Sequence, residues 1–269
     1  MEIFTDVAIY INTNYPYWFV FPVAMIVACT ASASGFSSGV ILQPFYDLFL
    51  GIPLVDSIAT SLGSQTLGTS SATIRYAMYK MIDAPIGFTL LMLTIPGIIV
   101  GNHALVVINE NLIKLFLGFV VLLIAIIQIH SAIKQKFGTR MRVPIEDVYK
   151  VMVVPPIAGF FSATTGTGII VLLQPTLEKG LNLMTKRANA TAIMVGALAN
   201  ICLTILNLNA GLIKLDLFVF AASGAFAGGQ LGPFVAKFLP ARIMKIAFSL
   251  AVSIIGVFYL YKGIQWVGQ

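Results

Sequence analysis

The stretch ACTASASGFSSG, residues 28–39, interrupts the first long apolar segment of the chain with small and hydroxyl-bearing residues. A second interruption, SATTGTG at residues 162–168, lies in a later apolar segment. Because glycine and serine weaken the interior of a helix, each stretch predicts a break between two short helices. The two breaks therefore predict two helical hairpins that enter an apolar medium and return from it.

The composition identifies that medium as a lipid bilayer. Hydrophobic residues make up 58% of the 269 residues and charged residues only 10%, whereas about 25% are charged in an average soluble domain. So few charges do not cover a soluble surface, which excludes a soluble enzyme, a disordered tail and a secreted disulfide scaffold. The net charge of +6 comes from Lys and Arg in short loops, so we expect no nucleic-acid partner. The class predicted is an all-α polytopic membrane protein.

The chain repeats itself at a shift of 131 residues. The shift superposes Gly35 on Gly166, Gln43-Pro44 on Gln174-Pro175, Asp47 on Glu178, and Ala59-Thr60 on Ala190-Thr191. Matches at one fixed shift across most of a half predict an internal duplication.

The distribution of positive charge favours two hairpins over two additional membrane crossings. If all eight apolar segments crossed, Lys and Arg would divide almost equally between the two sides. If the first segment of each half is a hairpin, the side of the linker carries 13 of the 16 positive residues: Arg75, Lys80, Lys134, Lys136, Arg140, Arg142, Lys150, Lys179, Lys186, Arg187, Lys237, Arg242 and Lys245. The positive-inside rule then predicts that the linker is cytoplasmic and the N-terminus outside.

Three crossings in each half are an odd number, so the second half is predicted to be inverted relative to the first. The expected fold is two inverted repeats, each a re-entrant broken-helix hairpin plus three transmembrane helices. The first repeat, 1–133, comprises a hairpin at 17–50 and crossings at 57–79, 85–107 and 111–133. A cytoplasmic linker follows at 134–148. The second repeat, 149–269, comprises a hairpin at 149–177 and crossings at 184–207, 213–236 and 241–262.

The sequence also resembles a known family in the residues around the two breaks. These read SGFSSGVILQP (34–44) with IATSL (58–62), and TTGTGIIVLLQP (164–175) with ANATAI (188–193). A polar, glycine-containing turn, a short apolar stretch ending in proline and a small-residue helix, all present twice, resemble the sulfite exporter TauE/SafE family, also called the 4-toluene sulfonate uptake family. The resemblance implies a transporter of sulfite, sulfonates or related sulfur anions.

The residues themselves predict an anion site at the two breaks. A half-helix that starts inside the membrane presents unpaired N–H groups and the positive end of its dipole, and glycine lets the backbone approach a ligand closely. Hydroxyl and amide side chains nearby can donate to oxyanion oxygens. The alternative for each residue is helix packing or interhelical hydrogen bonding. The predicted substrate-binding residues are Gly35, Ser37, Ser38, Gly39, Gln43, Thr60, Ser61, Gln65, Thr165, Gly166, Thr167, Gly168, Gln174, Thr191 and Asn200.

The function predicted is a secondary transporter that exports small sulfur-containing anions across the bacterial cytoplasmic membrane by alternating access. Its expected partners are the anion and the lipid bilayer. An anion leaving a cell that is negative inside is driven outward by the membrane potential. A passive anion channel is the first alternative. A membrane-embedded enzyme is the second, but the sequence contains no catalytic set, no metal-ligand spacing and no cofactor motif.

The charge distribution makes the topology testable. In a variant whose native cysteines are replaced by alanine, Lys179→Cys and Lys237→Cys are expected to resist an impermeant thiol reagent added to intact cells, because both lie on the cytoplasmic side. Lys114→Cys, on the opposite side, is the control and is expected to react. Ready labelling at both cytoplasmic positions would require eight crossings instead.

Overall fold

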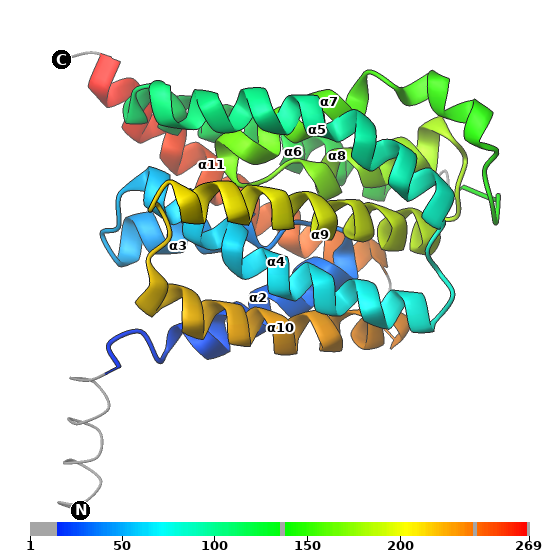
Figure 1. Cartoon of the computed structure of the whole chain (residues 1–269), viewed down its shortest axis with the longest axis horizontal. Helices are drawn as coiled ribbons and strands as arrows, with labels where there is room; N and C mark the ends of the chain where they lie inside the picture. Colours follow the sequence, from blue (N-terminus) through cyan, green and yellow to red (C-terminus); the bar gives the residue numbers. More distant parts are fainter. Residues whose placement is uncertain (1–14, 135–137, 239–240, 268–269) are drawn as a thin grey trace, which may run out of the picture.

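A computed structural model of the chain describes residues 15–134, 138–238 and 241–267 (Figure 1). Within them the protein is helical, with no β-strand and one isolated bridge, between Arg140 and Leu183. The predicted outer N-terminus, residues 1–14, and residues 135–137 of the predicted linker lie outside the described residues. The elements are α2 (Val20–Ser34), α3 (Gly39–Phe49), α4 (Leu54–Met78), α5 (Ala84–Val107), α6 (Glu110–Lys134), η1 (Ile145–Val151), α7 (Val154–Thr165), α8 (Ile169–Pro175), η2 (Thr176–Gly180), α9 (Thr185–Asn209), α10 (Leu215–Phe238) and α11 (Ala241–Val267).

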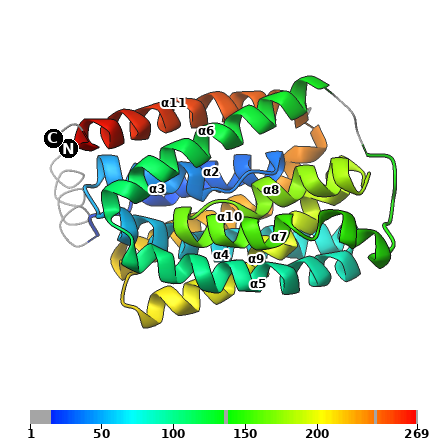
Figure 2. The same cartoon turned by 90° about the horizontal axis from the view of Figure 1, so that it is seen from above.

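The long helices form a bundle around four short ones. Helices α4 and α9 pack against each other, α10 packs against α2 and α4, and α5 packs against α7 and α9. Helices α6 and α11 pair with each other and lie side by side along one face (Figure 2). The short helices α2, α3, α7 and α8 each contact α6 or α11 as well as a helix of the larger group. The two breaks between short helices, at residues 35–38 and 166–168, are therefore enclosed by long helices.

Each break follows a helix that ends in a left-handed glycine. At the end of α2, Gly35 has φ 83°, and the N–H groups of Gly35 and Phe36 both donate 3.0 Å bonds to the carbonyl oxygen of Ala31. At the end of α7, Gly166 has φ 66°. Glycine adopts this conformation without the steric penalty of a Cβ, so it stops the helix at both places. The chain resumes as α3 at Gly39 and as α8 at Ile169.

Two close helix contacts recur at the 131-residue shift. A Cβ on Gly97 of α5 would lie 1.8 Å from the carbonyl oxygen of Pro156 in α7, and a Cβ on Gly228 of α10 would lie 2.2 Å from that of Met25 in α2. Both pairs of positions differ by 131. Only glycine permits backbones to approach this closely, as in membrane helix interfaces that use small residues.

The distribution of side chains suits a membrane protein. Large apolar side chains are exposed on the outer helices, while a series of hydroxyl and amide side chains is buried inside. In the described residues α5, α9 and α10 are long and apolar enough to cross a membrane. Helix α4 has the length to cross but carries many Ser, Thr and Gln residues, most of them buried. Such residues belong in a bundle interior rather than against lipid.

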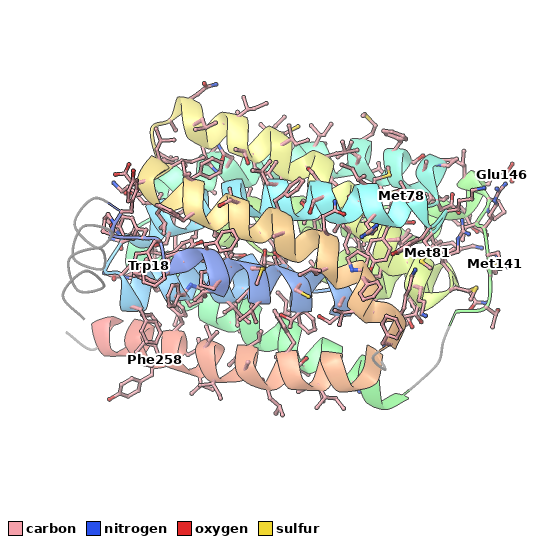
Figure 3. All side chains as sticks on the ribbon, turned by 90° about the horizontal axis from the view of Figure 1, so that it is seen from below. Trp18, Met78, Met81, Met141, Glu146 and Phe258 are labelled. Carbon is pink, nitrogen blue, oxygen red and sulfur yellow. The ribbon has the colours of Figure 1, made fainter. Side chains whose placement is uncertain are left out.

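The molecule has two ends. Met78, Met81, Met141 and Glu146 lie at one of them, here called the linker end, and Trp18 and Phe258 lie at the other (Figure 3). Within the predicted linker 134–148 the chain starts a 3₁₀ helix at Ile145, which continues to Val151. Asp147 in this helix accepts bonds from Lys150 and, at 2.9 Å, from Arg140, and these two cations lower the pKa of its carboxyl group.

The close contact at Gly228 predicts a large packing effect. Gly228→Val is expected to lower the free energy of unfolding by about 1–3 kcal/mol or more, because the added carbons overlap the backbone of α2. The thermal unfolding midpoint in detergent measures this. Ser223→Val, on the exposed face of the same helix, is the matched control and is expected to change little. Equal midpoints for both variants would contradict the packing.

Candidate functional site

The side-chain amide of Gln65 joins the two breaks. Ser37 Oγ in the first break donates to Gln65 Oε1, and Gln65 Nε2 donates a 3.1 Å bond to the carbonyl oxygen of Gly166 in the second. Gln65 is 1% exposed, so both bonds form away from water. A buried group left without its partner costs about 1–3 kcal/mol. Gln65 therefore fixes the two breaks relative to each other.

Each left-handed glycine faces a glutamine from the other half of the chain. A Cβ on Gly35 would lie 2.9 Å from Gln174 Oε1, and a Cβ on Gly166 would lie 2.3 Å from Gln43 Oε1. The two contacts are related by the same 131-residue shift. A side chain on either glycine would displace the glutamine, so each contact requires glycine for space as well as for conformation.

The buried amides leave hydrogen-bonding capacity unused. Within the described part of the chain, neither amide atom of the fully buried Gln43 has a partner. Gln174 Nε2 donates at 3.3 Å to Glu178 Oε2, and Asn189 Nδ2 donates at 3.2 Å to the carbonyl oxygen of Ser32, which leaves Gln174 Oε1 and Asn189 Oδ1 unpartnered. Unpaired buried polar groups call for a water or a ligand. Gln43 therefore keeps a donor and an acceptor unused, with Oε1 facing Gly166 in the second break, and the unused oxygens of Gln174 and Asn189 lie near Gly35.

The hydroxyl residues of the second break mainly hold its shape. Thr165 Oγ1 donates to the carbonyl oxygen of Phe161 at 2.6 Å and lies 3.0 Å from that of Thr167. Gly168, just before α8, faces the preceding helix α7, since a Cβ there would lie 2.8 Å from the carbonyl oxygen of Ala158. Thr167 is fully buried beside Thr165. In the first break, Ser38 lines a small cavity next to α8.

Thr60 and Thr191 lie away from the breaks. Thr60 Oγ1 accepts a 3.0 Å bond from the backbone N–H of Lys214, just before α10, and Thr191 Oγ1 accepts a 3.0 Å bond from that of Asp83, just before α5. These bonds tie each helix to a loop of the other half. Figure 1 shows the starts of α5 and α10 at opposite ends of the molecule, so the two threonines do not converge on one site.

The remaining predicted residues divide between the centre and the rest of the bundle. Ser61 lies beside the second break, because its Oγ is 3.4 Å from the Cβ position of Gly166. Asn200 is buried in α9 and no described hydrogen bond of its side chain links it to either break.

Sequence reasoning missed Tyr76 and left Asn189 out of the site. Tyr76 Oη donates to the carbonyl oxygen of Ser32 at 3.1 Å and accepts from Asn189 Nδ2 at 3.1 Å. The only sequence signal for Asn189 was its place in the ANATAI stretch.

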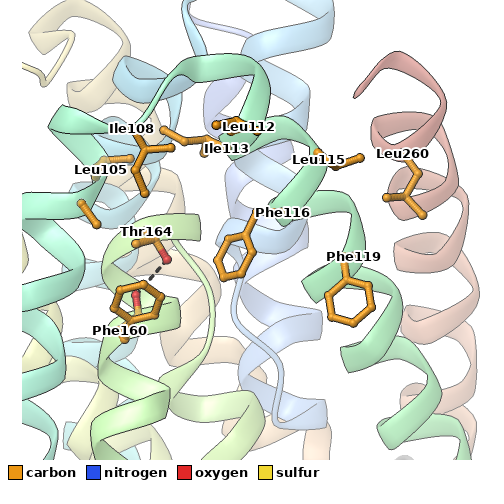
Figure 4. A pocket seen from close by; sticks show the side chains of 11 residues that line it. Leu105, Ile108, Leu112, Ile113, Leu115, Phe116, Phe119, Phe160, Thr164 and Leu260 are labelled. Carbon is orange, nitrogen blue, oxygen red and sulfur yellow. Dashed lines mark hydrogen bonds between the residues drawn. The ribbon is translucent and has the colours of Figure 1, made fainter. Parts of the chain in front are cut away.

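The two described cavities differ in size and in the chemistry of their linings. A groove of about 690 Å³ between α5, α6, α7 and α11 is lined by Leu, Ile and Phe side chains (Figure 4). Its one hydroxyl, on Thr164, donates to the carbonyl oxygen of Phe160 at 2.9 Å, so the lining offers no donor for an anion. The cavity beside Ser38 has a volume of about 10 Å³, roughly that of one water. The cavity at the first break therefore has room for about one water.

Together, the helical bundle, its apolar outer surface and its buried polar centre define a multi-pass membrane protein. The described residues contain no group of His, Cys, Asp and Glu that could hold a metal ion. The chain belongs to the sulfite exporter TauE/SafE family, whose sequence profile matches residues 20–259. It is accordingly a membrane transporter.

A relative in Bacillus subtilis (strain 168) supports the same class. The probable membrane transporter protein YunE is 22% identical to this chain over 261 residues, which cover 89% of this chain and 96% of YunE. No solved structure matches the chain significantly.

The bridge through Gln65 predicts a specific loss of stability. Gln65→Leu leaves Ser37 Oγ and the carbonyl oxygen of Gly166 without partners, and is expected to cost about 1–3 kcal/mol for each buried group left unpaired. Gln230→Leu is the matched control, because Gln230 donates one half-buried 2.9 Å bond, to the carbonyl oxygen of Ser71. The thermal midpoint should fall further for Gln65→Leu. An equal or smaller fall would show that Gln65 does not join the breaks.

Proposed function

We propose that the protein is a secondary transporter that exports small sulfur-containing anions, such as sulfite or a sulfonate, across the cytoplasmic membrane. The observation that carries this proposal is the Gln43 amide, which is fully buried, has no described partner and lies beside Gly166 in the second break. Gln43 Oε1 is the atom that faces Gly166, and rotation of the amide would present the unused Nε2 there instead, a neutral donor that attracts an oxyanion and also releases it. Membership of the family supports the sulfur chemistry of the substrate.

The start of α3 supplies the electrostatic part of the proposed site. This helix begins at Gly39 without a capping side chain, and a Cβ on Gly39 would lie 2.7 Å from the carbonyl oxygen of Gly166. Its positive end contributes up to about 2 kcal/mol to anion binding in a partly buried geometry. Hydrogen bonds to a charged group add roughly 1.5–3 kcal/mol each. Two or three contacts, less the cost of dehydrating the anion, give weak and reversible binding.

The proposed site is narrower than the set of residues predicted from sequence. Its centre is Gly39, Gln43, Gln65 and Gly166, with Ser61 at its edge. Next to this centre, the unpartnered oxygens of Gln174 and Asn189 lie near Gly35. A water or a hydroxyl group of the substrate would donate hydrogen bonds to them. Thr165, Thr167 and Gly168 shape the second break, and Thr60 and Thr191 fix the loops.

Alternating access is proposed to arise from two inverted repeats, 1–133 and 149–269, which share this centre. The contacts that recur at the 131-residue shift support the duplication: Gly35 with Gln174 and Gly166 with Gln43, Thr60 with the loop before α10 and Thr191 with the loop before α5. Two equivalent halves around one shared centre offer two equivalent ways to open it, one toward each side of the membrane. With the linker on the cytoplasmic side, the membrane potential drives an anion outward.

A thermal-shift panel on the purified protein tests the substrate. Sulfite, thiosulfate or a sulfonate is expected to raise the unfolding midpoint more than sulfate or short carboxylates do at equal ionic strength. Gln43→Glu preserves the shape but adds a negative charge, so it is expected to abolish the shift, and Gln43→Leu to weaken it. Asn207→Asp is the matched control, because Asn207 is also fully buried and unpartnered among the described residues but lies near the end of α9. Retention of the full shift in Gln43→Glu would place the anion elsewhere.

A further inference from the structure

Four cations gather around one corner of the linker end. Helix α4 ends at Met78, and the chain turns through Tyr79 and Lys80, whose φ of 54° is left-handed. Lys237 Nζ from α10 lies 3.6 Å from the centre of the Tyr79 ring, and Arg75 Cζ lies 6.0 Å from it. Arg187 Nη1 from α9 donates a 3.3 Å bond to the carbonyl oxygen of Lys80. The Tyr79 corner is defined as Arg75, Tyr79, Lys80, Arg187 and Lys237.

None of these four cations pairs with an acidic side chain among the described residues. The ion pairs described there join Asp147 to Arg140 and Lys150, and Asp56 to Lys214. The nearest acid along the chain, Asp83, is buried and accepts a 3.4 Å bond from the backbone N–H of Val143. Like charges held together repel one another. The face of Tyr79 compensates part of that repulsion by cation–π attraction but adds no negative charge.

Two arginines of the Tyr79 corner carry N–H donors that no described partner uses. Arg75 and Arg187 are half-buried, and the Nε atom of each is enclosed without a partner in the described structure. Arginine binds the oxygens of sulfate, sulfite or phosphate through parallel N–H groups, and lysine adds a point charge. The positive-inside rule accounts for positive charge at this end but not for the convergence of Arg75 and Lys237, from two helices, on the Tyr79 ring, nor for Arg187 bonding to the next residue, Lys80.

We propose that the Tyr79 corner is a second oxyanion-binding site, separate from the two breaks. Tyr76, in the last turn of α4, lies three residues before Tyr79. Tyr76 in turn bonds to Asn189, whose free Oδ1 lies 2.9 Å from the Cβ position of Gly35. The corner is thus separated from the first break by one hydrogen-bonded layer. If the proposed anion transport holds, on which this role rests, the corner collects the anion at the linker end.

Lysine reactivity tests the site directly, with sulfate as the probe. Sulfate at constant ionic strength is expected to slow acylation of Lys237 and Lys80 several-fold, measured by mass spectrometry in lipid-depleted detergent solution against chloride. Lys150, which is paired with Asp147, is the control and should not respond. Arg75→Gln is expected to remove the protection and Arg75→Lys to retain it, each after an unchanged thermal midpoint is shown.

A lipid headgroup offers the same chemistry through its phosphate, so a second arm uses nanodiscs. Protection of Lys237 by phosphatidylglycerol discs, but not by sulfate in detergent, would assign the oxyanion site to an anionic lipid. Protection by sulfate in discs of phosphatidylcholine alone would assign it to a free anion. Absence of protection in every arm, or equal protection of Lys150, overturns the proposal.

Transport measurements separate this proposal from the proposed function. If the free anion uses the corner, Arg75→Gln should raise the half-saturating concentration at the linker end several-fold and leave the maximal rate close to that of the wild type. Protection of Lys237 without any transport of a sulfur anion would retain the corner and reject the proposed function. Transport of a sulfur anion with an unchanged half-saturating concentration in Arg75→Gln, and with no protection of Lys237, would retain the proposed function and reject the corner.

Discussion

Backbone that unwinds inside a membrane protein exposes N–H and C=O groups that lipid cannot satisfy, so it persists only where other protein groups bind it. Gln65 meets this constraint at the second break, where its Nε2 binds the carbonyl oxygen of Gly166, and its Oε1 also accepts a bond from the Ser37 side chain in the first break. The rest of the architecture follows from it. The four short helices must be enclosed, and the long helices α4 and α9 that enclose them carry the polar side chains of the interior.

The two halves of the chain hold each other through equivalent contacts. Each left-handed glycine receives a glutamine from the other half, and each of the threonines Thr60 and Thr191 binds a loop of the other half. A contact made twice stabilises two positions by the same chemistry. Movement at one break therefore has a structural counterpart at the other, which suits a transporter that opens to two sides in turn.

The polar groups also differ between the two breaks. Both amide atoms of Gln43 are unpartnered among the described residues, whereas Gln174 and Asn189 each use the amide nitrogen and leave only the oxygen unpartnered. The two breaks are thus not chemically equivalent. The cations of the Tyr79 corner add a further asymmetry between the two ends of the molecule, because they lie at the linker end. In the proposed transport, charges at the linker end attract the anion, and neutral groups at the centre bind it weakly enough to release it.

The sequence by itself determined the membrane class, because a chain with 10% charged residues has no soluble alternative. It also determined the positions of the breaks and the 131-residue repetition, since glycine-rich interruptions and fixed spacings are local properties of the chain. Only the tertiary structure decided which groups meet. Gln43 and Gly166 are 123 positions apart, and Asn189 joins Tyr76 across 113. Sequence reasoning grouped Thr60 and Thr191 with the site, but the structure places them away from it. The packing of α4 against α10 and of α9 against α5 turns their hydroxyls toward the N–H groups of loops. Helical periodicity predicts which residues share a face, but the partner of that face depends on how distant helices pack.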